Sequence, residues 1–386
     1  MQLSLMARLE ERRLQLWQSD EESDSFWRLS ELEPSLWREL LAGNRVLTAT
    51  QFDRICRALV VDPGAMFRGE PVDADLAPAR FRGMSEGTLT NADDMRLLLL
   101  AAQVGRTLGH LANSLDRAFP VLKHRRPVGL HLRLQPWKQG YDLAARFGDL
   151  LNRGESPLLD FAAWMRGIGV HVVPVEFATS DIKGVTVAGN DSLPVVLVNM
   201  AHRGMSNPGV LRSTLAHELA HVLFDAGDKG YTSEVTRATV GRASGLERTE
   251  QRANAFAPAI LAPANVFKLS VLGTGAPLDE LGTWQRTAAH WGLSFEGAVS
   301  HGKNAVGLSE SLFLQLVAAR PRPRVSLDRF EPSLYGEFRS VSQRLSAKRL
   351  SHDQRFWQGL AGTLLADAVH AGVMAASRRV ELAGAE

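Results

Sequence analysis

The amino-acid sequence predicts a mainly α-helical protein with a small β-sheet, an α+β fold. Apolar residues recur at spacings of three and four through the first 70 residues and again after residue 271, the period of an amphipathic helix. Between residues 136 and 270, helical patterns alternate with short strand-like runs. The chain has 386 residues, 45% of them hydrophobic and 22% charged. This length and composition allow two or three domains with buried cores.

The composition argues against a secreted disulfide scaffold and against a membrane protein. A single cysteine cannot form an internal disulfide. The N-terminus lacks a basic segment leading into an apolar core, so no signal peptide is expected. The longest apolar stretch, residues 361–376, is interrupted by Asp367 and His370 and is too polar to cross a membrane. We expect a cytoplasmic protein without a membrane partner.

Residues 1–70 predict a helical N-terminal domain. A short helix ends near Leu32, a second spans about 34–41, and a third runs from residue 48 or 50 to 59. Gly43-Asn44 ends the second helix, and Asp62-Pro63 begins a further turn.

This pattern resembles the Xre/Cro-like helix-turn-helix domain, through Ser35-Leu36-x-Arg38, Gly43-x-Arg45, Ile55-x-x-Ala58-Leu59 and Asp62-Pro63. The resemblance implies that the helix with Ser35, Trp37 and Arg38 enters the DNA major groove, with Arg45 as a further contact. The domain carries nine basic and twelve acidic residues, which is unfavourable for phosphate contacts. Packing against the rest of the chain or homodimerisation therefore stand as alternatives.

Residues 71–135 predict a helical connector. It has a loop over 71–92 and, within 93–135, one long helix followed by a basic connector, Lys123-His124-Arg125-Arg126-Pro127. The stretch 106–153 holds nine basic and three acidic residues, and 320–355 holds nine basic and four acidic residues. Either stretch could bind nucleic acid, or its arginines could pack on neighbouring elements and face solvent. The Arg/Pro run 320–324 predicts a linker within a helical C-terminal region, 306–386, of unassigned role.

The motif His217-Glu218-Leu219-Ala220-His221 carries the strongest chemical signal. Two histidines four residues apart lie on one face of a helix, where both imidazoles can bind one Zn²⁺. Glu218 follows the first histidine and could act as general base on the water that the metal activates.

A zinc peptidase needs a third protein ligand, and a helical pattern over 247–257 offers one. Glu250 is the preferred candidate, with Glu247, one turn earlier, as the competitor. Ala253 and Ala257 share a face with Glu250 and allow this helix to approach the histidine helix closely. Asn254, one turn after Glu250, could orient a metal ligand from behind.

Together these motifs resemble the ImmA/IrrE family of zinc metallopeptidases over about residues 136–305. That family has a strand ending in Asn, a His-Glu-x-x-His helix, and a later Glu-x-x-Ala-Asn-x-Phe-Ala helix. The chain departs mildly where it has Ile260-Leu261-Ala262-Pro263 in place of Leu-Leu-Met-Pro. The resemblance implies a zincin-like peptidase domain with one Zn²⁺ per chain. The matching segments are 161–172, 194–199, 217–221, 250–257, 261–263 and 288–296.

The resemblance also implies a narrow substrate: a partner transcriptional repressor, cleaved to switch on a stress, mobile-element or defence response. An extended substrate could add to the strand formed by Val195, Val196, Leu197, Val198 and Asn199. The glycine-rich segment 225–248, which includes Tyr231, could be an active-site flap or a surface loop, and Tyr231 either an oxyanion donor or a packed residue.

Two other functions remain open at this stage. In one, the chain is an Xre-type DNA-binding transcription regulator whose peptidase-like region is a sensor or pseudo-enzyme. In the other, it is a general zinc peptidase. The intact Glu218 and both histidines favour an enzyme, and the appended domains favour a restricted one.

Overall fold

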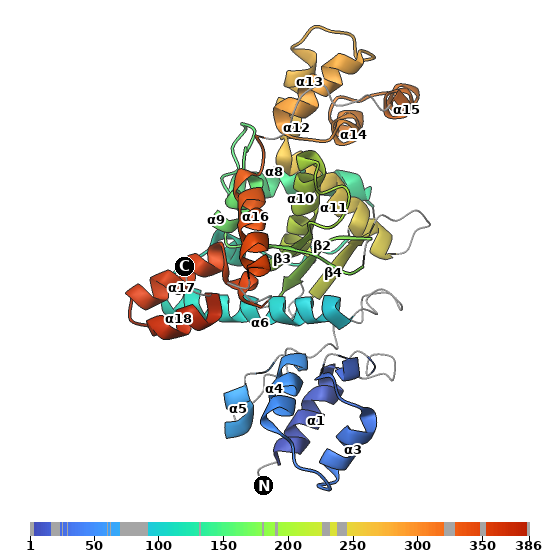
Figure 1. Cartoon of the computed structure of the whole chain (residues 1–386). Coiled ribbons are helices and arrows are strands. Elements are labelled where there is room, and N and C mark those ends of the chain that lie inside the picture. The colour runs from blue at the N-terminus through green and yellow to red at the C-terminus, as the bar shows by residue number, and fades with distance from the viewer. Residues whose placement is uncertain are drawn as a thin grey trace.

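The computed structural model describes residues 4–16, 24, 26–28, 30–59, 61, 63–69, 92–130, 133–179, 181–189, 192–225, 232–237, 245–319, 329–347 and 353–383. It is mostly helical with one small sheet, as the sequence predicts (Figure 1). The predicted loop over 71–91, Tyr231 and the predicted linker 320–324 lie outside the described residues.

The described N-terminal helices are α1 (Leu5–Leu16), α3 (Pro34–Leu41), α4 (Ala49–Ala58) and α5 (Pro63–Arg68). The bounds of α3 and α4 agree to within one residue with those that the sequence predicts. The four helices enclose a small hydrophobic cluster of their own. The buried members of this cluster are Leu9, Phe26, Leu32, Trp37, Ile55, Cys56, Ala58, Leu59 and Met66.

The prediction that Trp37 contacts DNA is wrong. Its side chain is 2% exposed and packs edge-on against Phe26 and Trp27, with ring centroids 5.3 and 6.1 Å away. The indole Nε1 donates a hydrogen bond to Glu10 Oε2 at 2.8 Å. A large aromatic side chain gains more free energy in this core than on a reading face.

The long helix predicted within 93–135 is two helices. Helix α6 (Ala92–Ser114) ends in a turn in which Asp116 has φ of 50°, and α7 (Pro120–His124) begins at a proline. Helix α6 lies along the sheet and contacts β2 and β3 (Figure 1). Its apolar side chains join the main hydrophobic core. The segment predicted as a connector therefore contributes a core element.

The sheet has the strand order β1-β3-β2-β4. Strand β1 (His171–Val175) runs parallel to β3 (Val195–Asn199), and β2 (Ile182–Ala188) runs antiparallel to both β3 and β4 (Thr232–Arg237). Strand β4 falls in the segment 225–248, for which the sequence predicts a flap or a loop; this part of the segment belongs to the sheet.

The prediction that Val195–Asn199 receives an extended substrate by strand addition is wrong. Strand β3 pairs with β1 along one edge and with β2 along the other, so both rows of backbone groups already have partners. All five residues of β3 are buried. Strand addition requires an unpaired edge, which this strand lacks.

Three helices pack on one another beside this sheet: α8 (Pro136–Leu150), α10 (Pro208–Phe224) and α11 (Gly245–Leu261). Helices α8 and α11 approach so closely that a Cβ at Gly140 would lie 2.4 Å from the backbone oxygen of Arg252 and 2.9 Å from the nitrogen of Phe256. Glycine at this position therefore sets the distance between the two helices.

Replacing Gly140 with Ala is expected to destabilise the protein by about 1–3 kcal/mol, because backbone atoms of α11 must move. Gly336→Ala in α16 (Pro332–Ser346) is the matched control, since nothing lies within 4 Å of a Cβ there. That change should stabilise by up to about 1 kcal/mol through helix propensity. Urea unfolding of both variants measures the difference, and equal midpoints would contradict the packing argument.

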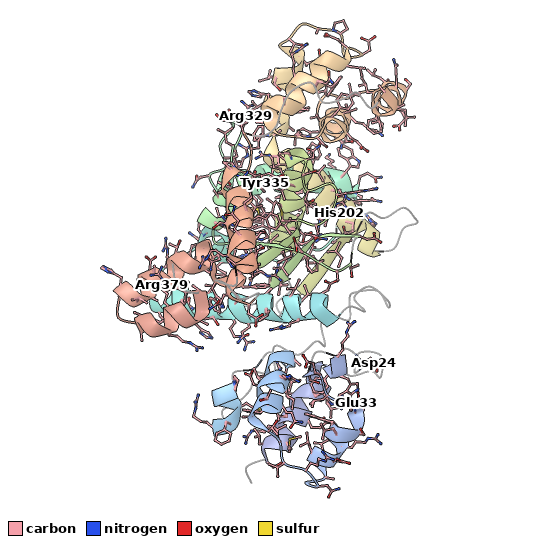
Figure 2. The ribbon with its side chains drawn as sticks, viewed as in Figure 1. Asp24, Glu33, His202, Arg329, Tyr335 and Arg379 are labelled. Atoms are coloured by element: carbon pink, nitrogen blue, oxygen red, sulfur yellow. The ribbon has the colours of Figure 1, made fainter. Side chains whose placement is uncertain are left out.

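The C-terminal helices pack on the same core. Helix α16 contacts α9 (Phe161–Gly167) and β1, and Tyr335 donates a hydrogen bond to the backbone oxygen of Met205 at 2.6 Å (Figure 2). Helix α17 (Leu360–His370) contacts α6 and β1. The other helical segments after α11 are α12 (Ala264–Leu272), α13 (Leu281–Trp291), α14 (Phe295–Ala305), α15 (Glu310–Ala319), η3 (Gln354–Trp357) and α18 (Ala376–Ala383).

Part of the basic stretch 106–153 makes internal hydrogen bonds. Arg153 is 4% exposed and donates through Nε to the backbone oxygen of Ile260 at 2.6 Å, and Arg125 donates to that of Gly189 at 2.5 Å.

Among the described residues, no single helix is long and apolar enough to cross a membrane. The bent helix pair 248–261 and 264–272 is long and apolar enough, but only by length and composition.

Candidate metal centre

Helix α10 carries both histidines and is buried along almost its whole length. Asn207 caps its start by accepting a hydrogen bond from Gly209 N at 2.9 Å, and Pro208 occupies the first turn, where no N–H is needed. His217 and His221 lie one turn apart, with their Nε2 atoms separated by 2.9 Å. The helix thus presents two imidazole nitrogens to one point.

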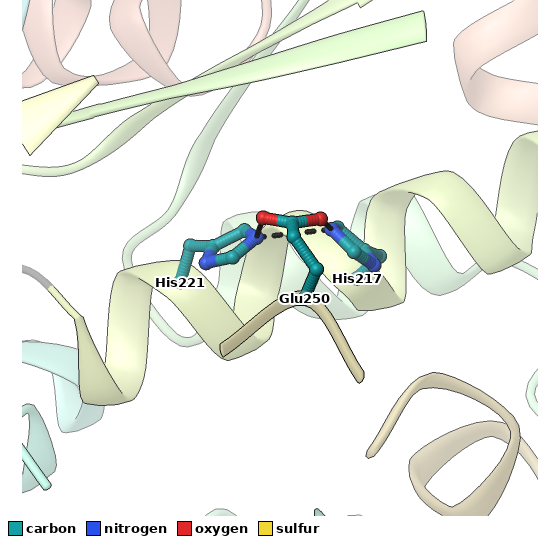
Figure 3. Close-up of side chains that lie close together, drawn as sticks. All are labelled: His217, His221 and Glu250. Carbon is teal, nitrogen blue, oxygen red and sulfur yellow. Dashed lines mark hydrogen bonds and ion pairs between the residues drawn. The ribbon is translucent and has the colours of Figure 1, made fainter. Parts of the chain in front are cut away.

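Glu250 of α11 reaches the same point from the neighbouring helix. Its Oε2 lies 3.2 Å from His217 Nε2, and its Oε1 lies 3.3 Å from His221 Nε2 (Figure 3). One ligand atom from each residue lies within 4.8 Å of the others, a spacing that could hold a metal ion. Both histidines are buried, and the Glu250 side chain is 20% exposed. The side chain of Glu247, the competing candidate, lies outside the described residues.

The outer nitrogen of each imidazole has an oxygen partner. His217 Nδ1 lies 3.0 Å from Asn254 Oδ1, and His221 Nδ1 lies 2.9 Å from Asp225 Oδ2. Each oxygen accepts a hydrogen bond from Nδ1, which leaves the Nε2 lone pair directed into the cluster. Asn254 lies where the sequence predicts it, whereas a role for Asp225 was not predicted, although Asp225 stands four residues after His221.

The cluster favours positive charge between its three side chains. Burial alone would raise the pKa of the Glu250 carboxyl, but hydrogen bonds and charges from His217 and His221 outweigh it and hold that pKa well below its ordinary value. Burial acts to lower the pKa of His221, but the hydrogen bonds that it donates to Asp225 and Glu250, together with the charges of these carboxylates, raise it well above the ordinary value.

Glu218 is fully buried between α10 and strand β2. The Thr186 hydroxyl donates a hydrogen bond to Glu218 Oε2 at 2.7 Å. Two residues earlier on β2, a Cβ at Gly184 would lie 3.0 Å from Glu218 Oε1, so the missing side chain leaves room for the carboxylate. Neither Gly184 nor Thr186 was predicted to belong to the site. They are two residues apart on β2 and therefore face the same side of the sheet.

The donor set fits a zinc ion. Two imidazole nitrogens and one carboxylate are ligands that Zn²⁺ binds in catalytic sites, where three protein ligands leave a fourth position for water. Ca²⁺ and Mg²⁺ prefer sites built from oxygen ligands alone. The oxygen partners behind both histidines are also typical of metal-ligating imidazoles.

The structure brings His217, His221 and Glu250 together, with Asn254 behind His217. Ser35 and Arg38 are exposed in α3, and Arg45 forms an exposed ion pair with Glu39 at 2.8 Å. Ser35 and Arg38 lie in α3 and Arg45 in the turn that follows it, and their contact with DNA remains a prediction.

Comparison with known families agrees with this geometry. Residues 166–300 match the family model of the IrrE N-terminal-like domain, Peptidase_M78. The match supports the ImmA/IrrE peptidase family and a metallopeptidase-type function in general. The matched range contains all three clustered residues, whereas the N-terminal helices and the C-terminal region lie outside it. A comparison with curated proteins finds no match.

Proposed function

We propose that this protein is a zinc-dependent metallopeptidase in which His217, His221 and Glu250 hold one Zn²⁺ per chain. The observation that carries the proposal is the convergence of three ligand atoms within 4.8 Å, with Asn254 and Asp225 behind the histidines. The family match over 166–300 supports the same class of activity.

In the proposed mechanism the buried carboxylate of Glu218 moves the protons. A bound Zn²⁺ would supply Lewis-acid chemistry, lowering the pKa of water and polarising the scissile carbonyl. Glu218 would accept the proton of the attacking water and pass it to the leaving amine. The Thr186 hydroxyl, 2.7 Å from Oε2, would keep the carboxylate in one orientation for both transfers.

An extended substrate would pair with β4 instead of β3. Within the part of the chain that the structure describes, β4 is the outer strand on the side of β2. Strand β2 contacts α10 and contributes Thr186 to Glu218, so this side of the sheet adjoins the proposed site. A peptide added there would run alongside the sheet, with its backbone aligned by main-chain hydrogen bonds.

We propose a partner transcriptional repressor as the substrate, on the strength of the two resemblances carried by one chain. Cleavage of a specific regulator would explain why a peptidase module carries N-terminal and C-terminal regions beyond the matched range. Stress, mobile-element or defence genes would then be the responding class. The cytoplasm is the proposed compartment.

The alternative is a DNA-binding regulator with a peptidase-like sensor. Ser35 and Arg38 in α3 are exposed and so available to contact DNA, which supports this alternative. A regulator of this kind should bind its own promoter with a steep salt dependence and should be indifferent to Glu218→Gln. An enzyme should require the Glu218 carboxylate.

Purified wild-type protein is expected to contain close to one zinc per chain, and Glu250→Gln much less, because a neutral amide is a poor replacement for the carboxylate ligand. Glu310→Gln is the control, since it removes a surface carboxylate paired with Lys303. Metal analysis by mass spectrometry gives the content. Little zinc in the wild type would refute the metal site, and full zinc in Glu250→Gln would assign the third ligand to Glu247 or elsewhere.

A further inference from the structure

Asp225 and Arg252 form a buried ion pair next to the proposed zinc site, between the end of α10 and the middle of α11. Their side chains are 12% and 2% exposed. We propose that Asp225, held in place by Arg252, is a positioning residue that orients His221 for metal binding. The inference rests on the proposed zinc site and adds two residues to it.

The Asp225 carboxylate uses its two oxygens for two different partners. Oδ2 accepts a hydrogen bond from His221 Nδ1 at 2.9 Å, and Oδ1 accepts one from Arg252 Nη2. The first contact fixes the rotation of the imidazole and places its proton on Nδ1, so that Nε2 points at Glu250. The second contact fixes the carboxylate itself.

The position of Asp225 makes Arg252 necessary. Asp225 is the C-cap residue of α10, where the negative end of the helix dipole disfavours a carboxylate. The guanidinium of Arg252 offsets this repulsion. The carboxylate of Asp225 therefore occupies an electrostatically unfavourable position. Its hydrogen bond to His221 explains why a carboxylate is present there.

Arg252 is itself anchored by the segment that precedes α8. Its Nη1 donates a hydrogen bond to the backbone oxygen of Val128 at 2.5 Å. The same segment donates from Arg126 N to Leu223 O at 3.0 Å and from Val128 N to Phe224 O at 2.8 Å. Residues 126–128 therefore tie the last turn of α10 to Arg252, although the sequence offers this basic stretch as an anion-binding surface.

Helix α11 thereby supports the site in three ways. Glu250 is a proposed ligand, Asn254 contacts His217, and Arg252 acts on His221 through Asp225. The two histidines differ in their partners: His217 has a neutral amide, whereas His221 has a carboxylate backed by a cation. Because a carboxylate partner raises the basicity of an imidazole ligand, the His221 side should contribute strongly to zinc affinity.

The test measures zinc affinity in competition with a chelator. Asp225→Asn and Arg252→Gln are each expected to weaken zinc binding by about 10- to 100-fold. The double variant should lose no more than Asp225→Asn alone, since Arg252 acts through Asp225. Arg252→Gln leaves every atom that contacts His221 in place, so it answers the question even if Asp225→Asn cannot be purified.

Glu337→Gln is the matched control, because it breaks another largely buried ion pair, to Arg166, with side chains 14% and 13% exposed. It should lower stability and leave zinc affinity unchanged. Wild-type zinc affinity in both Asp225→Asn and Arg252→Gln would overturn the positioning role while the zinc site stands. Absence of zinc binding by the wild type would overturn the proposed function and this inference together.

Discussion

Glu218→Gln is expected to lower peptide cleavage by about 10²- to 10⁴-fold while the protein keeps its zinc. Glutamine has nearly the shape of glutamate but cannot take up the proton of the attacking water. The side chain is fully buried, and the Thr186 hydroxyl that donates to Oε2 at 2.7 Å can also donate to the Glu218 backbone oxygen at 3.0 Å. The substitution should therefore leave the fold and the ligands in place.

The measurement pairs cleavage of candidate repressors, followed by electrophoresis, with zinc content in the same preparation. Thr186→Val is the informative companion, because it removes the hydrogen bond to Glu218 and keeps the carboxylate. We expect it to slow cleavage less than Glu218→Gln does. Cleavage by Glu218→Gln at the wild-type rate would exclude Glu218 as the general base. Promoter binding that is unchanged in Glu218→Gln would favour the alternative of a DNA-binding regulator.

The metal cluster was predictable because its geometry is mostly local. A spacing of four along one helix fixes His217 and His221 whatever the rest of the chain does. Glu250 required one further step, the approach of a second helix, which the small residues of α11 indicated. Asp225 was within reach of the same argument, since it lies one turn beyond His221.

The environment of Glu218 could not be predicted in this way. Thr186 and Gly184 reach it only because β2 pairs with β3 and β4 in a particular register, which sets the face that meets α10. No short-range pattern in the sequence specifies that register. The prediction that residues 195–199 bind the substrate was wrong for a different reason. An uninterrupted apolar run such as 195–198 is typical of a strand that is buried on both faces, and such a strand lies in the centre of a sheet.

Trp37 shows how an amphipathic helix can be assigned the wrong face. The helix-turn-helix resemblance put Trp37 on the DNA-reading face, although its spacing from Leu40 and Leu41 places it on the apolar half of α3. Burial of Trp37 and Leu40 in the structure settles which side faces inward. Contacts across the chain, here with Phe26 and Glu10, decided which aromatic side chain faced inward.

The packing of the C-terminal region could not be predicted from the sequence, because it depends on long-range contacts such as the ion pair between Glu331 and Arg212. Glu331 and Arg212 are 119 residues apart in sequence, and both side chains are fully buried. Arg212 Nη1 donates to Glu331 Oε1 at 2.6 Å. The same carboxylate accepts hydrogen bonds from Phe161 N and Ala162 N, both at 2.8 Å, and so caps the start of α9.

Glu331→Gln is expected to destabilise the protein by about 3–5 kcal/mol, because it removes the carboxylate that forms the buried ion pair with Arg212. Asp367→Asn is the control: it breaks a surface pair with Arg117, whose side chains are 43% and 45% exposed, and should cost about 0–1 kcal/mol. Urea unfolding followed by circular dichroism measures both. Equal losses of unfolding free energy in the two variants would show that the buried ion pair stabilises the fold no more than the surface pair does.

Removing both charges tests the account more closely. A buried ion pair can often be replaced by apolar residues at little cost. Here Arg212→Met with Glu331→Leu should recover only part of the loss, because the N–H groups of Phe161 and Ala162 lose their acceptor. Arg212 stands five residues before His217 on α10, so the contact links the C-terminal region to the helix that carries the proposed metal ligands. A chain that ends before residue 329 would lose both the Glu331 carboxylate and the Phe330 ring, which lies 4.6 Å from the Arg212 guanidinium, and we expect it not to fold stably.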